Sequence, residues 1–173
     1  MTAPLLRRTT GRYRVAKAPR YDGVHNGLDT TAAAHIVLEA LAREISRATP
    51  AVLRGDDTRA VHDMRVSIRR LRSALETIGE TIPSKRRKAM RRAARRIGGK
   101  LGPVRDADVH LAVLRAALAG APSIDRAGIA FAIDTIGDRR RTALTSFAIE
   151  LSQIDRDLFI EPIARAIDGA SDA

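Results

Sequence analysis

The stretch from Val61 to Leu75 carries two helical stripes at once, and it constrains the fold more than any other segment. Apolar side chains recur at spacings of three and four residues, which is typical of a helix packed into a bundle. This apolar stripe comprises Val61, Met64, Ile68, Leu71, Leu75 and Ile78. A cationic stripe follows the same rhythm one residue later and comprises His62, Arg65, Arg69 and Arg72. Because a helix turns by about 100° per residue, these cations lie on the flank of the buried seam, where they are held semi-rigidly and can contact a polyanion.

Composition favours helices throughout the chain. The 173 residues are enough for one domain with its own core, and 45% of them are apolar. Aromatic residues make up only 3% and Trp is absent, so Leu, Ile, Val and Ala must fill the interior. Strands favour aromatic and β-branched side chains, whereas packed helices can form a core from Leu, Ile, Val and Ala. The sequence therefore predicts an all-α fold, an antiparallel bundle of four to five helices joined by short turns.

Several classes of protein are excluded by what the sequence lacks. No stretch reaches the length of about 18 apolar residues that a membrane-spanning helix needs. The first residues contain no apolar run of the kind found in signal peptides, so we expect a cytoplasmic protein. The absence of cysteine excludes disulfides, thiolate metal sites and cysteine nucleophiles.

The apolar periodicity begins only near residue 29. Residues 1–28 contain prolines and glycines without a helical pattern, so we expect a basic, irregular arm. Residues 29–168 form the predicted bundle, and residues 169–173 form a frayed tail. No internal repeat is evident, which favours a single domain.

Cap residues and prolines set the expected boundaries of the first two helices. The first helix should begin at Asp29 or Thr30, which offer N-cap oxygens. It should end near Ala48, because Pro50 follows and stops it. The second helix should span about residues 58–79.

Glycines and a proline divide the next segment in this prediction. A third helix starts with Ser84 as its N-cap and weakens at Gly98, Gly99 and Gly102. Pro103 then occupies the first turn of a fourth helix, where the helix dipole favours the negative charge of Asp106 and Asp108. The remaining predicted elements are a long helix over about 123–153, disturbed at Gly137, and a short helix over about 156–167.

The net charge of +11 is concentrated in one block. Residues 58–105 contain 15 Lys or Arg against three Asp or Glu, a net charge of +12, whereas residues 106–173 contain seven against eleven. Eight of the twelve residues from Lys85 to Arg96 are Lys or Arg. Such a concentration indicates a surface for an anionic partner. Arginine dominates the block, and its planar guanidinium matches phosphate oxygens in a bidentate way.

Two motifs resemble the signature of a known family. The first is Val61-His62-Asp63-Met64-Arg65-Val66 with Arg69-Arg70-Leu71-Arg72, and the second is Leu101-Gly102-Pro103-Val104-Arg105-Asp106-Ala107-Asp108-Val109. In this order and at this separation they are similar to the CHAD domain, the conserved-histidine α-helical domain, over roughly residues 30–155. The resemblance implies a helical bundle that binds inorganic polyphosphate through basic side chains and does not hydrolyse it. It implies no cofactor, and it suggests association with polyphosphate granules.

The resemblance also implies which side chains face the polymer. The two motifs contribute His62, Arg65, Arg69, Arg70, Arg72 and Arg105. The helix between the motifs contributes Lys88, Arg91, Arg92, Arg95, Arg96 and Lys100. Asp106 and Asp108 are expected to orient arginines rather than to contact the anion.

One difference from the family concerns its internal symmetry. Family members usually contain two related halves, each with a His-Arg motif, and the anion lies at their junction. No second such motif follows residue 110, so this chain resembles a single half. We therefore expect a homodimer whose two-fold axis brings two basic faces together around a shared polyanion.

Two non-catalytic alternatives remain open. In the first alternative, the cationic stripe is a solvated face or forms salt bridges with Asp106, Asp108 or Glu76. The excess positive charges of residues 58–105 outnumber these three carboxylates, which argues against it. In the second alternative the ligand is nucleic acid, whose backbone also presents a row of phosphates. The scarcity of aromatic residues argues against a single-strand reader, and the third helix contains almost none of the Asn, Gln and Ser residues with which a helix-turn-helix protein reads bases.

The sequence contains no credible catalytic or metal-binding constellation, so we expect a binding protein rather than an enzyme. A polyphosphate phosphatase or kinase needs carboxylates clustered inside the basic face, and Asp63, Glu76 and Glu80 are poor candidates. Asp106 and Asp108 as magnesium ligands or general bases are the less favoured interpretation. The four histidines are not spaced as zinc ligands, and no glycine-rich phosphate loop is present.

Overall fold

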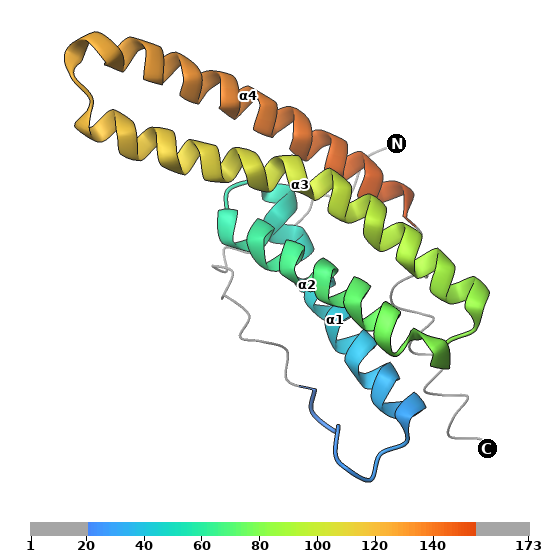
Figure 1. The fold of residues 1–173 in the computed structure, drawn as a ribbon. Coiled ribbons are helices and arrows are strands. Elements are labelled where there is room, and N and C mark those ends of the chain that lie inside the picture. Colours follow the sequence, from blue (N-terminus) through green and yellow to red (C-terminus); the bar gives the residue numbers. More distant parts are fainter. Residues whose placement is uncertain (1–20, 155–173) are drawn as a thin grey trace.

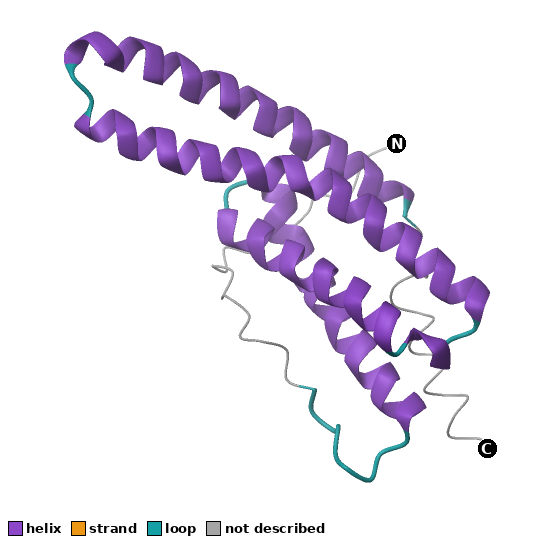
Figure 2. Cartoon of the chain, viewed as in Figure 1, coloured by secondary structure: helices purple, strands orange, loops and turns teal. Residues whose placement is uncertain are grey.

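The structure, a computed structural model, describes residues 21–154. Within this range the chain forms helices and no strand (Figure 2). The elements are α1 (Thr30–Arg54), α2 (Thr58–Thr77), the 3-10 helix η1 (Gly79–Thr81), α3 (Ser84–Gly120) and α4 (Ser123–Gln153). The prediction of an all-α bundle is confirmed. Most of the predicted basic arm, the short helix over 156–167 and the tail lie outside the described residues.

The four helices form two antiparallel hairpins of unequal length (Figure 1). α1 packs against α2, α3 packs against α4, and the contact between α2 and α3 joins the two hairpins. The α3–α4 hairpin extends well beyond α1 and α2, so its far half stands uncovered by them (Figure 1). We refer to residues 109–135, around the turn between α3 and α4, as the distal hairpin.

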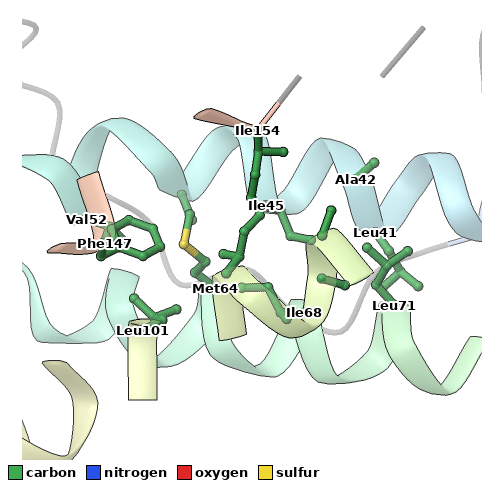
Figure 3. Close-up of a cluster of buried hydrophobic side chains, with 14 of the residues drawn as sticks. Leu41, Ala42, Ile45, Val52, Met64, Ile68, Leu71, Leu101, Phe147 and Ile154 are labelled. Atoms are coloured by element: carbon green, nitrogen blue, oxygen red, sulfur yellow. The ribbon is translucent and has the colours of Figure 1, made fainter. Parts of the chain in front are cut away.

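The core lies where all four helices meet (Figure 3). Leu41 of α1, Met64 of α2, Leu101 of α3 and Phe147 of α4 are almost completely buried in it. The apolar stripe predicted for α2 is part of this core, and its members from Val61 to Leu75 are all buried. The apolar stripe therefore positions α2 against the core, as its helical spacing predicts.

α1 begins as predicted but ends later. The Asp29 carboxylate caps it by accepting hydrogen bonds from the backbone N–H groups of Thr31 and Ala32. The predicted end near Ala48 is wrong, because α1 continues through Pro50 to Arg54. Pro50 is exposed, so water can satisfy the carbonyl that its missing N–H leaves free. The residues that follow it, Ala51 and Val52, are buried, and this packing extends the helix.

α3 is one helix where the sequence predicts two. Its glycines and Pro103 all lie inside a single helix of 37 residues. The buried stripe runs without interruption past them and comprises Met90, Ala93, Ala94, Ile97, Leu101, Val104, Ala107, Asp108 and Leu111. Pro103 removes the N–H that would bond to the carbonyl of Gly99, but both residues are exposed to water. Continuous packing of the apolar face therefore outweighs the local helix-breaking signals.

Three smaller predictions about α3 and α4 also need correction. Ser84 is the first residue of α3 and not its N-cap, since Pro83 occupies the cap position and no side chain caps the helix. Asp106 and Asp108 lie in the interior of α3, so the argument from the helix dipole does not apply to them. α4 has the predicted bounds, and Gly137 does not disturb it.

Candidate functional site

Two contacts fix the way in which α2 lies along α3. The guanidinium of Arg91 on α3 pairs with the carboxylate of Glu76 on α2 at 3.3 Å. Nearer the other end of α2, the Arg65 guanidinium reaches over α3, where a Cβ atom added to Gly102 would lie 3.5 Å from its Nη1. The two helices are therefore antiparallel, with Arg65 lying against Gly102.

Extended along the two helices, this antiparallel register predicts which of their cations lie opposite one another. Position 72 of α2 should face position 95 of α3, and position 62 should face position 105, one pair on each side of the close approach at Gly98. Gly98 permits that approach, since a Cβ atom there would lie 3.3 Å from a methyl group of Ile68. We define the α2–α3 basic surface as His62, Arg65, Arg69, Arg72, Arg91, Arg95 and Arg105.

The other predicted binding residues lie elsewhere. Arg70 is half-buried on the opposite flank of α2, near Ser67, whose hydroxyl donates to Glu44 of α1. Arg96 faces α4 and pairs with Glu150 at 2.6 Å. Lys100 lies one turn further along the same side of α3 and lines the same groove as Arg96. Lys88 and Arg92 precede Arg96 at the same four-residue spacing, and both are exposed. The twelve predicted residues thus do not all share one face.

Few of these cations are neutralised by the protein itself. Among the described residues, ten of the twelve predicted binding residues have no carboxylate within 4.0 Å, and only Arg91 and Arg96 form ion pairs. The alternative in which salt bridges absorb the cationic stripe requires Asp106, Asp108 or Glu76 as partners. Glu76 pairs with Arg91, but neither aspartate pairs with any residue of the stripe. The α2–α3 basic surface therefore keeps most of its positive charge.

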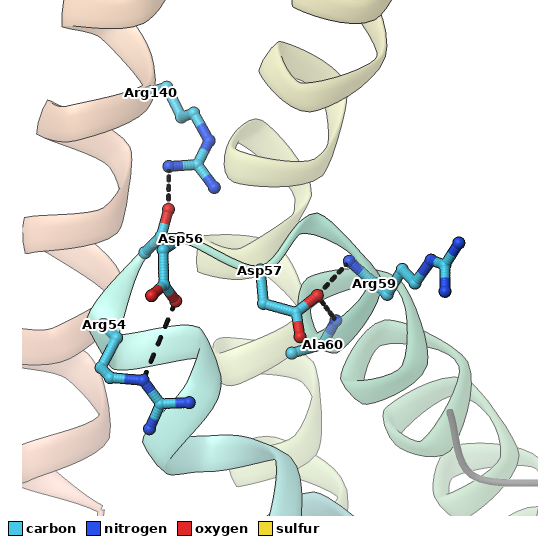
Figure 4. A network of polar contacts seen from close by, with 7 residues as sticks. Arg54, Asp56, Asp57, Arg59, Ala60 and Arg140 are labelled. Atoms are coloured by element: carbon cyan, nitrogen blue, oxygen red, sulfur yellow. Dashed lines mark hydrogen bonds and ion pairs between the residues drawn. The ribbon is translucent and has the colours of Figure 1, made fainter. Parts of the chain in front are cut away.

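The two predicted orienting acids differ in environment. Asp106 is exposed and forms no ion pair within the described part of the chain. Asp108 is buried and binds Nε of Arg140 on α4 through Oδ1 at 2.5 Å. The same guanidinium donates through Nη1 to the carbonyl oxygen of Gly55 at 2.8 Å, at the end of α1 (Figure 4). Asp108 does orient an arginine, but the arginine belongs to the packing of the hairpins and not to the motif.

Sequence reasoning missed the cations of α4. Residues 139–141 are three consecutive arginines in an otherwise acidic third of the chain, and this cluster is the sequence feature from which these cations could have been predicted. Arg140 is the partner of Asp108, and Arg141 pairs with Asp138. Arg139 lines a groove between α3 and α4 together with Arg95, Arg96 and Lys100.

No group of three or more His, Asp or Glu side chains in residues 21–154 is arranged to hold a metal ion. None of the helices in that range is both long enough and apolar enough to cross a membrane.

Comparison with known proteins identifies one family. The family model of the CHAD domain matches residues 36–164, which include both motifs and all of the α2–α3 basic surface. No curated protein and no solved structure matches the chain.

Proposed function

This chain belongs to the CHAD domain family, and we propose that it binds inorganic polyphosphate through the α2–α3 basic surface without hydrolysing it. CHAD domains are associated with polyphosphate-related proteins. The observation that carries the proposal is the row of uncompensated cations that α2 and α3 present along their contact. A linear polyanion of closely spaced phosphates is the ligand whose charge repeats along such a row.

Binding is electrostatic in this proposal. Arginines of the two helices neutralise successive phosphates, and the counterions condensed on the polymer are released. Mutual repulsion among neighbouring guanidinium groups is relieved at the same time. Affinity should therefore increase with polymer length, because a longer chain spans more cations.

A role in binding rather than in catalysis is supported by the state of the nearby carboxylates. Glu76 is engaged by Arg91 and Asp108 by Arg140, while Asp63 and Asp106 have no ion pair within the described residues. A hydrolase would need carboxylates grouped to hold metal ions beside the phosphates, and residues 21–154 contain no group of three or more His, Asp or Glu that could do so. Incubation with long-chain polyphosphate and magnesium, followed by an assay for released phosphate, should detect no turnover.

The test of the proposal is a competition titration at physiological salt. Labelled polyphosphate is bound first, and unlabelled polyphosphate, tRNA or duplex DNA is added. Polyphosphate should compete best, because the low aromatic content offers no stacking platform for bases. Equal competition by all three would contradict a specific preference for polyphosphate, and stronger competition by tRNA or DNA would favour nucleic acid, the second class of ligand that the charge admits.

Two variants make the titration specific. Arg65→Ala/Arg69→Ala should weaken polyphosphate binding by at least about tenfold, since two charge-assisted phosphate contacts are lost. Arg47→Ala/Arg115→Ala removes the same charge from α1 and from the distal hairpin, and it should have little effect. Equal weakening in both variants would contradict a defined surface.

We further propose that two copies complete the site, and that the protein associates with polyphosphate granules. The distal hairpin supports the first part, because its apolar side chains remain uncovered in a single copy. Val113, Ile124 and Phe131 there are 62%, 86% and 74% exposed. A contiguous exposed apolar patch marks an interaction site. Packing of two distal hairpins would form a four-helix bundle around a two-fold axis.

A further inference from the structure

A second cationic hollow lies beside the α2–α3 basic surface, in the groove between α3 and α4. Its volume is about 720 Å³. Four cations line it, with Arg95, Arg96 and Lys100 contributed by α3 and Arg139 by α4. Arg95 also belongs to the α2–α3 basic surface, so the two regions share this side chain. Gly99 lies in the groove, and a Cβ atom there would meet nothing within 4 Å, which leaves the hollow open.

The carboxylates of the groove are already engaged. Glu150 is largely buried and pairs with Arg96, while Asp138 pairs with Arg141. Arg95, Lys100 and Arg139 have no carboxylate within 4.0 Å among the described residues. Three unneutralised cations around one hollow repel one another, and an anion between them relieves that repulsion.

The groove also offers a hydroxyl donor. Ser146 lines it and makes no hydrogen bond with any described residue. Its O–H is therefore free to donate to an anionic oxygen. The hydroxyl of Thr142, in contrast, is occupied as a donor to the carbonyl of Asp138. Cations from two helices together with a free hydroxyl form a set of donors that suits phosphate oxygens.

We propose that the α3–α4 groove is a second phosphate-binding site, which continues the path of the polymer from the α2–α3 basic surface across Arg95 to α4. Arg139, Lys100 and Ser146 are its binding residues, and consecutive phosphates of a linear polyphosphate are its ligand. This inference rests on the proposed function. It adds a contact from α4 that lies outside both sequence motifs.

The test measures binding of long-chain polyphosphate to Arg139→Ala, Arg139→Lys and Arg115→Ala in the full chain. Arg139→Ala should weaken binding about three- to tenfold, since one charge-assisted contact is lost. Arg139→Lys keeps the charge but loses the bidentate guanidinium, so it should recover part of the affinity. Arg115, like Arg139, is exposed and unpaired among the described residues, but it lies in the distal hairpin, so Arg115→Ala should bind as the wild type does.

The outcomes separate this inference from the proposed function. If Arg139→Ala binds normally while Arg65→Ala/Arg69→Ala is weakened, the groove is not a site and the α2–α3 basic surface stands alone. Equal weakening by Arg139→Ala and Arg115→Ala would also overturn the groove, because only total charge would then matter. Failure of the wild type to bind polyphosphate would overturn both. The melting temperature of Arg139→Ala should match that of the wild type, which excludes loss of fold as the cause.

Discussion

Arg140 joins three segments of the molecule through one guanidinium. It pairs with Asp108 of α3, donates to the carbonyl of Gly55 at the end of α1, and extends from α4. The Asp108 side chain is only 1% exposed. A carboxylate in such a place is tolerated because its charge is balanced, and loss of its partner leaves that charge buried alone.

Removal of Arg140 should therefore be costly. Arg140→Ala should lower the free energy of unfolding by about 3 kcal/mol, measured by urea denaturation followed by far-UV circular dichroism. Asp106→Asn is the control, since Asp106 is an exposed carboxylate two residues from Asp108 and has no ion-pair partner among the described residues. This change should alter the free energy of unfolding by no more than about 0.5 kcal/mol. Similar values for the two variants would contradict the structural role of the buried pair.

Asp29 gives α1 a dependence on pH. Hydrogen bonds from the backbone N–H groups of Ala32 and Thr31 lower the pKa of its carboxyl below the ordinary value of 3.8. A carboxyl with a lowered pKa stabilises the folded chain above its ordinary pKa, and that contribution is lost as the pH falls through the lowered value. Asp29→Asn keeps a capping oxygen but does not titrate, so it should lose less stability than the wild type between about pH 5 and about pH 2. An identical loss in both proteins would show that the cap does not titrate as described.

The role of a single residue can be predicted from the sequence when its side chain acts within its own helix. The apolar stripe of α2 and the cap at Asp29 follow from local spacing and were predictable. The partner of Asp108 was not, because it lies 32 residues away on another helix. One local signal was present, since Asp108 falls on the same buried stripe as Leu101 and Val104, and an acid in that position requires a buried cation.

α3 shows how packing overrides local preference at the scale of an element. Gly98, Gly99, Gly102 and Pro103 within six residues predict a break, and α3 nevertheless continues through them as one helix. One of the glycines is useful there, because the absence of a side chain at Gly98 lets Ile68 of α2 approach closely. The sequence contains both the helix-breaking residues and the apolar periodicity, but it does not show which of the two prevails. The free energy gained by burying Ile97, Leu101 and Val104 depends on helices that are distant in the chain.

Two glycine substitutions should have opposite effects on stability. Gly128 lies inside α4, where an added Cβ meets nothing, so Gly128→Ala should stabilise the protein by about 0.5 to 1 kcal/mol. Gly55 has a φ of 76°, and its Cβ would lie 2.7 Å from a methyl group of Leu144, so Gly55→Ala should destabilise it. Thermal unfolding of both variants tests this, and a change of the same sign in both would contradict the description of these two positions.

The surface of the molecule has two regions that differ in chemical character. The block from α2 into α3 carries the excess positive charge, whereas the distal hairpin exposes apolar side chains. The sequence predicted the fold class, the antiparallel order and the location of the charge. It did not predict that Arg96 and Lys100 turn away from α2 towards α4, because the rotation of α3 depends on both neighbours.

Dimerisation through the distal hairpin is a prediction at the same scale. Light scattering of the wild type with polyphosphate should give twice the mass of one chain. Phe131→Asp should give a single chain, because it places a charge in the apolar contact. Ile149→Asp, an exposed position on α4 outside the distal hairpin, should remain a dimer. A wild type that is monomeric both with and without polyphosphate would remove the proposed dimer.

The central claim is that unneutralised cations along α2 and α3 bind a polymer of phosphates by releasing its counterions. The salt dependence of polyphosphate affinity measures this most directly. For the wild type, the logarithm of the binding constant should fall steeply and linearly with the logarithm of the salt concentration. Arg65→Ala/Arg69→Ala should reduce the slope by roughly 0.7 to 1 for each arginine removed. A binding constant that does not respond to salt, or a slope that the variant leaves unchanged, would contradict the account.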